Sequence, residues 1–198
     1  MKSLFIIPLV LMSLVLTVSP VYSMNFLCGS VGIGCETVTK EELVQKGSLY
    51  FKKFSDVPFT GEVEGKWQGA FKNGKKYGEW KYYESSGVMD SSGNYEDGKK
   101  IGPWQYYWSD GTLQYEGDFL DGKLKGVWSG YWVNGNVSFK GSFRTGAKES
   151  PFVSFKGERD GQWEEYFENG QLKFKGDYKD GERDGQWEEY FENGQLKF

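Results

Sequence analysis

The chain has 198 residues, with 24 basic and 28 acidic side chains, 2 cysteines and no histidine. This acidic balance, without a basic cluster, argues against nucleic acid and against anionic lipid surfaces as partners. The absence of histidine excludes a His-based catalytic triad, and two cysteines alone argue against a zinc site.

An apolar run opens the chain. It extends from Leu4 to Val18, and Ser19-Pro20 and Ser23 follow it. A short basic start, an apolar stretch and small residues before a cleavage point are typical of a secretory signal peptide. The alternative is an uncleaved membrane anchor, but the run is shorter than the ~20 residues of a bilayer-spanning helix. We therefore expect residues 1–23 to be removed and the protein to be exported, to the periplasm, the cell envelope or the medium.

Residues 24–57 form a second predicted segment. In an exported protein Cys28 and Cys35 can form a disulfide, and two free thiols are the alternative that the sequence leaves open. The run Thr39-Lys40-Glu41-Glu42, with Leu43 and Val44 behind it, predicts the start of a short helix. Such a helix would cap the first strands of a repeat array.

The same 18-residue string occurs twice, at 157–174 and 181–198. This identity indicates a tandem duplication, in which one repeat is one supersecondary unit of a stack. The unit has a glycine two residues before a tryptophan, an aromatic residue three after it, a glycine at +7 and an apolar residue at +9. These positions are counted from the tryptophan, which is position 0. Successive position-0 tryptophans are 24, 24, 35 and 24 residues apart. The repeat-framework residues are the tryptophans Trp80, Trp104, Trp128, Trp163 and Trp187 and the +7 glycines Gly87, Gly111, Gly135, Gly170 and Gly194.

The repeats predict an array of about six units over residues 58–198. The first unit is shortened, extra residues near 147–157 lengthen the longest interval, and the last unit is truncated. We expect the extra residues to form a loop or a half-strand. The open edge of the last unit, with exposed apolar residues, predicts an edge-strand dimer.

The segments between the turn residues alternate in polarity and are rich in aromatic residues, which predicts strands. A two-residue turn at Asn169-Gly170 would place Phe167 opposite Leu172 and Trp163 opposite Gly176. A second turn at Asp180-Gly181 would then place Phe174 opposite Trp187 and Tyr178 beside Arg183. The predicted fold is all-β: an elongated single-layer antiparallel β-meander of tandem hairpins of ~24 residues, with one aromatic and one charged face.

The pattern Gly-x-Trp-x-x-Tyr-aromatic-x-Asn-Gly-x-Leu-x-aromatic-x-Gly-x-aromatic-x-x-Gly, clearest over 161–181, resembles the MORN-repeat family. It is most similar to the bacterial variant called the YwqK-type antitoxin group, which the Pro58-Phe59-Thr60-Gly61 entry also resembles. The resemblance covers about residues 58–198. It implies a scaffold or binding surface, in some members at membranes, although the charge here does not indicate membrane association.

Paired carboxylates are the only candidates for catalysis. Glu164-Glu165 and Glu188-Glu189 are adjacent in strands, so each pair would be split between the two faces of the sheet. The aspartates near residue 180 lack the spacing of a calcium loop and fit turns instead. We therefore expect no enzyme activity, no cofactor and no metal.

The aromatic residues are the remaining candidates for binding. The tryptophans at position 0 recur in every unit and are predicted to be framework. Position +4 varies between units, and its aromatic residues are the candidate binding surface: Trp108, Trp132, Phe167 and Phe191.

The sequence predicts an exported, non-enzymatic repeat protein whose sheet binds a protein partner or a component of the cell envelope. Two alternatives are carbohydrate or cell-wall binding through the aromatic face, and an antitoxin-like role as the partner of a toxin.

Overall fold

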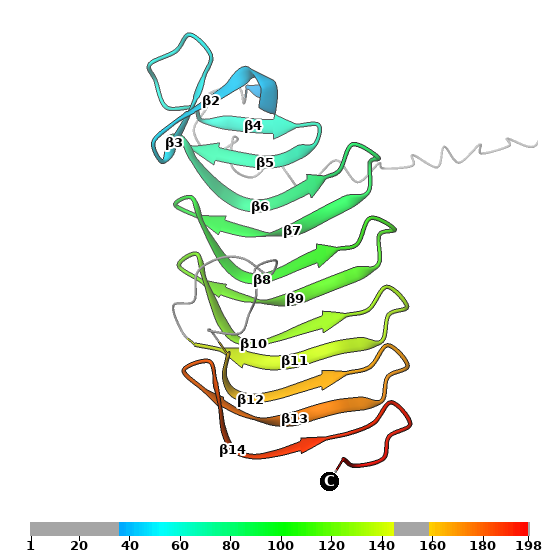
Figure 1. Cartoon of the computed structure of the whole chain (residues 1–198). Helices are drawn as coiled ribbons and strands as arrows, with labels where there is room; N and C mark the ends of the chain where they lie inside the picture. Colours follow the sequence, from blue (N-terminus) through cyan, green and yellow to red (C-terminus); the bar gives the residue numbers. More distant parts are fainter. Residues whose placement is uncertain (1–35, 145–158, 198) are drawn as a thin grey trace, which may run out of the picture. The chain divides into compact units, whose positions relative to one another are not determined.

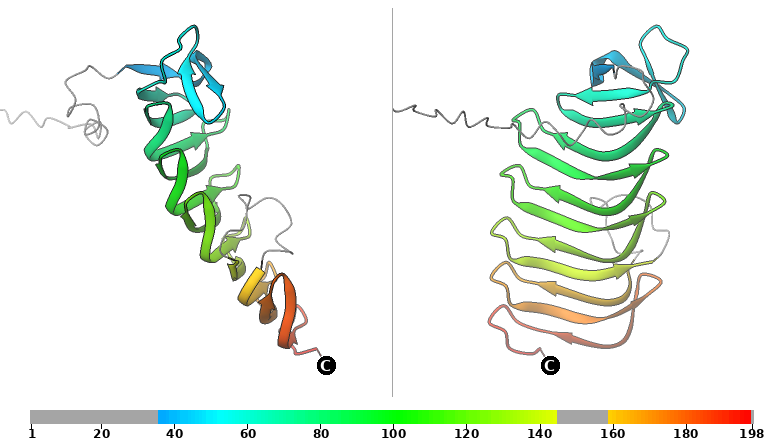
Figure 2. Two further views of the ribbon diagram at one scale, coloured as in Figure 1. Left: turned by 90° about the vertical axis from the view of Figure 1, so that its left-hand side faces the viewer. Right: turned by 180° about the vertical axis from the view of Figure 1, so that it is seen from behind.

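A computed structural model describes residues 36–144 and 159–197 (Figure 1). One sheet of 12 strands has the order β1-β4-β5 and then consecutive strands to β14. Its neighbours are antiparallel, except that β1 and β4 are parallel. The predicted all-β meander of consecutive hairpins is confirmed (Figure 2). The strands are β1 (Thr37–Thr39), β2 (Leu43–Lys46), β3 (Leu49–Lys52), β4 (Gly61–Glu64), β5 (Trp67–Lys72), β6 (Lys75–Tyr83), β7 (Met89–Glu96), β8 (Lys99–Tyr107), β9 (Leu113–Leu120), β10 (Lys123–Tyr131), β11 (Val137–Phe143), β12 (Arg159–Tyr166), β13 (Leu172–Lys179) and β14 (Glu182–Glu189).

The segment before the repeats has one helical turn where the sequence predicted a helix start, and it continues as a hairpin. The element η1 (Lys40–Glu42) is a single 3₁₀ turn, in which the Glu42 carboxylate accepts hydrogen bonds from the Thr39 N–H and hydroxyl. The chain then enters β2, so the helix expected over Leu43 and Val44 is wrong. Strands β2 and β3 pair with each other, and Leu43 is buried. Cross-strand pairing and burial outweigh a weak local helix signal.

Two kinds of turn alternate along the array. The Asp180-Gly181 turn has positive φ at both residues, 52° and 84°, as a two-residue type I′ turn requires. At the Asn-Gly turn, the Gly170 N–H donates to the Phe167 carbonyl and the Phe167 N–H donates to the Gln171 carbonyl. This is a three-residue loop, with positive φ only at the glycine. The two-residue turn predicted at Asn169-Gly170 is therefore wrong.

The extra loop residue changes the register beside this turn and leaves the rest of the β12–β13 pair as predicted. Trp163 lies opposite Gly176, as expected. Tyr166, in place of Phe167, pairs with Leu172. The other residue pairs of the hairpin keep the predicted register, because the extra residue forms a bulge beside the turn, at one end of the strand pair.

A second bulge shifts the β13–β14 pair. Tyr178 pairs with Arg183 as predicted, but Phe174 pairs with Glu189 and not with Trp187. The register shifts between Gly176 and Asp177, where the opposite strand carries the glycine that precedes each tryptophan. These glycines have φ between 60° and 81°, a conformation that favours glycine and bends the strand. The bend is visible in β6, β8 and β10 in Figure 1, and the glycines are Gly78, Gly102, Gly126, Gly161 and Gly185.

Three predictions concern residues outside those that the structure describes. They are the signal peptide at 1–23, the alternative states of Cys28 and Cys35, and the insertion near 147–157. Across residues 36–144 and 159–197, the structure has no helix with the length and apolar character of a membrane span.

Candidate functional site

Each repeat is built around a tryptophan that lies across a glycine of the neighbouring strand. The Trp104 indole covers Gly93, and a Cβ at this glycine would overlap the indole carbons. Its Nε1 donates to the Asn94 carbonyl at 3.2 Å, and the side chain is 1% exposed. The structure thus places the position-0 tryptophans where a framework residue belongs. The other pairs are Trp80 over Gly69, Trp128 over Gly117, Trp163 over Gly141 and Trp187 over Gly176.

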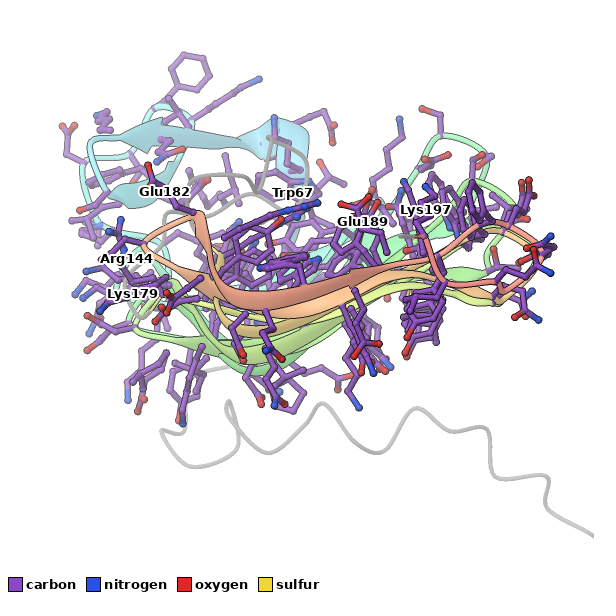
Figure 3. The ribbon with its side chains drawn as sticks, turned by 60° about the horizontal axis from the view of Figure 1, so that its bottom comes forward. Trp67, Arg144, Lys179, Glu182, Glu189 and Lys197 are labelled. Atoms are coloured by element: carbon purple, nitrogen blue, oxygen red, sulfur yellow. The ribbon has the colours of Figure 1, made fainter. Side chains whose placement is uncertain are left out.

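These tryptophans share one face of the sheet, which we call the tryptophan face. Rings from the intervening strands connect them: the Tyr95 ring centre lies 5.8 Å from that of Trp80 and 5.1 Å from that of Trp104, edge to face. Figure 3 shows that Trp67, from the shortened first unit, lies on the concave side of the curved sheet. A continuous row of rings along this side therefore provides the core of a single-layer sheet.

A cation covers the indole in four of the five units that have a position-0 tryptophan. Lys100 Nζ lies 4.6 Å from the Trp104 ring centre and donates to the Tyr106 hydroxyl at 3.0 Å. In the last unit the pair is Arg183, 4.3 Å from the ring centre, with Glu189 at 2.7 Å. These pairs were not predicted from the sequence. Their signal is a basic residue at −4 together with tyrosine or glutamate at +2: Lys76 with Tyr82, Lys100 with Tyr106, Arg159 with Glu165 and Arg183 with Glu189.

The unit around Trp128 departs from this pattern. Position −4 is the buried Leu124, and position +2 is Gly130, which is covered by the Phe139 ring. Phe139 also stacks on Trp163, with ring centres 5.2 Å apart and planes inclined by 6°. In this orientation Trp163 Nε1 has no hydrogen-bond partner among the described residues, unlike the equivalent atom of the earlier units. In the Trp128 unit, apolar contacts of Leu124 and Phe139 therefore take the place of the cation and its hydrogen-bond partner.

The structure brings the candidate residues at +4 to the turns that contain the +7 glycines. Trp108 Nε1 donates to the Tyr131 carbonyl at 3.2 Å, and Trp132 Nε1 donates to the Tyr166 carbonyl at 3.3 Å. Each +4 tryptophan therefore holds the next unit as well as facing solvent. Trp132 is 36% exposed and Phe191 is 51% exposed. These residues, with Phe167, make an edge ladder along one side of the array.

The opposite side of the sheet, which we call the polar face, carries the side chains at −1 and +1. Shallow hollows lie between these two rows, over the glycine–tryptophan pairs. The first hollow is lined by Glu79, Gln105, Glu116 and Asp118, among others, and contains no basic residue. Two more hollows occur at equivalent positions further along, and their charged lining residues are Lys140, Glu164, Lys175, Asp177 and Glu188.

Tyrosines at +3 line the polar face beside the +1 row. The Tyr107 hydroxyl donates to Gln105 at 3.0 Å, and the Tyr166 hydroxyl donates to Glu164 at 2.6 Å. Burial and then the Glu164 carboxylate raise the pKa of Tyr166 to about 12. These rings are half-buried and held by their hydroxyls, so they present fixed flat surfaces.

The paired carboxylates are split between the faces, as expected. Glu164 lies on the polar face with Tyr166, whereas Glu165 contacts Arg159 at 3.9 Å and Lys173 at 3.1 Å. Within the described ranges, no group of three or more acidic or cysteine side chains is arranged to hold a metal ion.

Four segments of the chain match the family model described as MORN repeat variant. The matched residues are 76–97, 100–121, 159–180 and 183–198. Each matched segment begins at the residue that covers the tryptophan. The unit from Lys123, which has Leu124 in place of the cation, is not among them. No curated protein matches the chain. MORN repeats indicate a repeat protein with a binding role, in a family that is generally non-catalytic.

Proposed function

We propose that the protein is an exported, non-enzymatic scaffold that binds a protein partner along the polar face of its MORN-variant array. One observation supports this most directly: the hollows between the −1 and +1 rows recur at equivalent positions in successive units. A row of similar shallow sites suits an extended partner better than a small substrate, which needs one enclosed pocket. Export rests on the apolar run from Leu4 to Val18.

The tryptophan face is less suited to this role. Its large side chains are already packed, and Trp80, Trp104 and Trp128 are at most 1% exposed. The lysines that cover Trp80 and Trp104 also donate hydrogen bonds to tyrosines of the same unit. A partner would have to displace contacts that stabilise the fold, whereas the polar face offers side chains that end in solvent.

Affinity purification of the processed protein from its native envelope, followed by mass spectrometry, tests the proposal. We expect a protein partner that is retained by the wild type and lost from a variant with Glu116→Gln and Asp118→Asn on the polar face. A matched control, Glu182→Gln with Glu192→Gln, changes the net charge equally outside the hollows and should retain the partner. Failure of every variant and the wild type to retain a protein would contradict the proposed function.

A second candidate is carbohydrate or cell-wall binding at the edge ladder, favoured by the exposure of Trp132 and Phe191. Flat exposed aromatic rings in a row can stack on sugar rings. Cell-wall pull-down that is lost on Trp108→Ala and Trp132→Ala, but kept by the polar-face variant, would support this candidate over the first. An antitoxin-like role is a special case of the first candidate, and the same purification would identify a toxin as the retained protein.

A further inference from the structure

Strand geometry fixes the spacing of the hollows on the polar face. Neighbouring strands of a sheet lie ~4.8 Å apart and each unit contributes two strands, so equivalent side chains recur every ~9.6 Å across the strands. The +1 row follows this rule, since Gln105 on β8 lies opposite Glu116 on β9 and Glu164 on β12 lies opposite Lys175 on β13. A partner that follows the row over several units must itself repeat at about this distance.

The repeat distance discriminates between peptide conformations. A polyproline II helix has three residues per turn and rises ~3.1 Å per residue, so it repeats every ~9.3 Å. A β-strand repeats every ~6.8 Å, and an α-helix advances ~6.4 residues over ~9.6 Å, which is not a whole number of turns. Only the polyproline II helix presents the same side to each successive unit, with a drift of ~0.3 Å per unit.

The net charge of the hollows favours a basic partner, and two of their carboxylates are already ion-paired, Glu79 with Lys81 at 3.0 Å and Glu188 with Lys175 at 3.1 Å. Glu116 and Asp118 line the first hollow together with Glu79, without a basic residue in the lining. Of the two hollows further along, one is lined by one carboxylate and one lysine, and the other by three carboxylates and one lysine. Together the three hollows have six lining carboxylates, Glu79, Glu116, Asp118, Glu164, Asp177 and Glu188, against two lysines, Lys140 and Lys175.

The +3 tyrosines supply the surface against which proline rings pack. Polyproline II ligands dock in grooves lined with aromatic side chains, where the preformed helix loses little entropy. Tyr107 and Tyr166 are half-buried, and their hydroxyls are bound to Gln105 and Glu164 of the +1 row, so their rings lie beside the hollows in a fixed orientation. The tyrosine row therefore runs parallel to the +1 row at the same spacing, with one residue of each row per unit.

We propose that the polar face binds a basic, proline-rich segment of a partner protein as a polyproline II helix that runs across the strands, three residues to each MORN unit. This inference rests on the proposed function and names the class of partner. Arginine or lysine at every third position would face the carboxylates, and the prolines between them would contact the tyrosine row.

Fluorescence anisotropy with a labelled peptide of Pro-Pro-Arg triplets tests the proposal. We expect binding that strengthens with each added triplet up to about four triplets, because ~three residues span one unit. Salt should weaken the binding, because the charges are solvent-exposed. A Gly-Ser-Arg peptide of equal length and charge, which lacks the preformed helix, should bind about tenfold more weakly. Equal affinity of the two peptides would overturn the conformational part of the proposal.

The polar-face variant locates the site. Glu116→Gln with Asp118→Asn should weaken the Pro-Pro-Arg peptide about tenfold, whereas Glu182→Gln with Glu192→Gln should leave the affinity within about twofold. Tyr107→Ala should weaken binding while Trp132→Ala, on the edge ladder, should not. Near-ultraviolet circular dichroism of each variant verifies that the fold is retained. Equal weakening by the two charge variants would overturn the placement on the polar face.

The two proposals fail in different experiments. If the native partner is retained through the polar face but no Pro-Pro-Arg peptide binds the purified protein, the proposed function stands and this inference is wrong. If an acidic or a helical peptide competes with the retained partner while the proline-rich peptide does not, the inference is likewise wrong. If no partner is retained by the wild type, the proposed function itself is contradicted.

Discussion

The Trp104 indole lies across Gly93 so closely that no side chain fits between them. The ring shields the strand backbone from water, and its Nε1 hydrogen bonds to the carbonyl of the next residue, Asn94. The glycine and the tryptophan are therefore one structural unit, repeated along the array. This relationship explains why a strand that should be weakened by glycine carries one in every repeat.

Gly93→Ala should destabilise the protein by about 2 kcal/mol, because the added methyl group must displace a ring that is fixed on all sides. Urea unfolding monitored by tryptophan fluorescence would measure the loss. Ser92→Ala, one residue earlier in β7, is the matched control, since its side chain points to the polar face and the change should cost under about 0.5 kcal/mol. Equal costs at the two positions would show that the indole does not fill the space over the glycine.

Replacing tryptophan by phenylalanine should cost more at Trp104 than at Trp163. Both changes remove similar buried volume, but only the first removes a hydrogen bond, and it leaves the Asn94 carbonyl without this donor. At Trp163 the lost Nε1 has no partner among the described residues. We expect a difference of about 1 kcal/mol in the free energy of unfolding between the two variants. A larger loss of unfolding free energy for Trp163→Phe than for Trp104→Phe would show that the Trp163 Nε1 has a hydrogen-bond partner in solution.

Much of the fold follows from residue spacing. The recurrence of Gly-x-Trp and the placement of Trp163 opposite Gly176 depend on alternation along a strand, which the sequence displays directly. The turns and bulges were harder to predict. Asn-Gly and Asp-Gly both favour tight turns, and only the backbone hydrogen bonds and φ angles distinguish the three-residue loop before Gln171 from the two-residue turn at Asp180.

The candidate site was predicted less completely. The sequence placed the position-0 tryptophans in the framework, and the structure buries four of the five. It did not reveal the cations over four of the five indoles, because residues at −4 and +2 lie on either side of a bulge and become neighbours only when the strand bends. The hollows of the polar face were not predicted for a similar reason. Each is lined by residues from several strands, which become neighbours only in the folded sheet.

Lys100→Met should destabilise the protein by about 1 kcal/mol. The change keeps most of the aliphatic stem over Trp104 but removes the cation 4.6 Å from the ring centre and the hydrogen bond to Tyr106. Leu124→Met is the matched control at the same repeat position, where the cover is already apolar, and swaps of this kind usually cost under about 1.5 kcal/mol. Thermal unfolding of the wild type and both variants at low and high salt would measure the two costs. We expect high salt to reduce the cost of Lys100→Met and to leave the cost of Leu124→Met unchanged.

Tyr166 should make the stability of the protein depend on alkaline pH. Burial and the Glu164 carboxylate raise the pKa of this hydroxyl from its ordinary value near 10 to about 12 in the folded state. A pKa raised by folding means that the neutral form is favoured in the native state. Its contribution to stability is therefore complete below pH ~10 and is lost as the pH rises from ~10 through ~12.

Ultraviolet titration of tyrosinate, with Tyr166→Phe to assign the signal, would measure this ionisation directly. Glu164→Gln removes the negative charge beside the hydroxyl but keeps a hydrogen-bond acceptor. We expect it to lower the pKa of Tyr166 toward its ordinary value, because the carboxylate disfavours the phenolate. The same substitution should make the alkaline loss of stability smaller and complete at a lower pH, because the folded-state pKa then lies closer to the unfolded value. An unchanged Tyr166 titration in Glu164→Gln would show that burial alone sets its pKa and that the hydroxyl is not bound to this carboxylate.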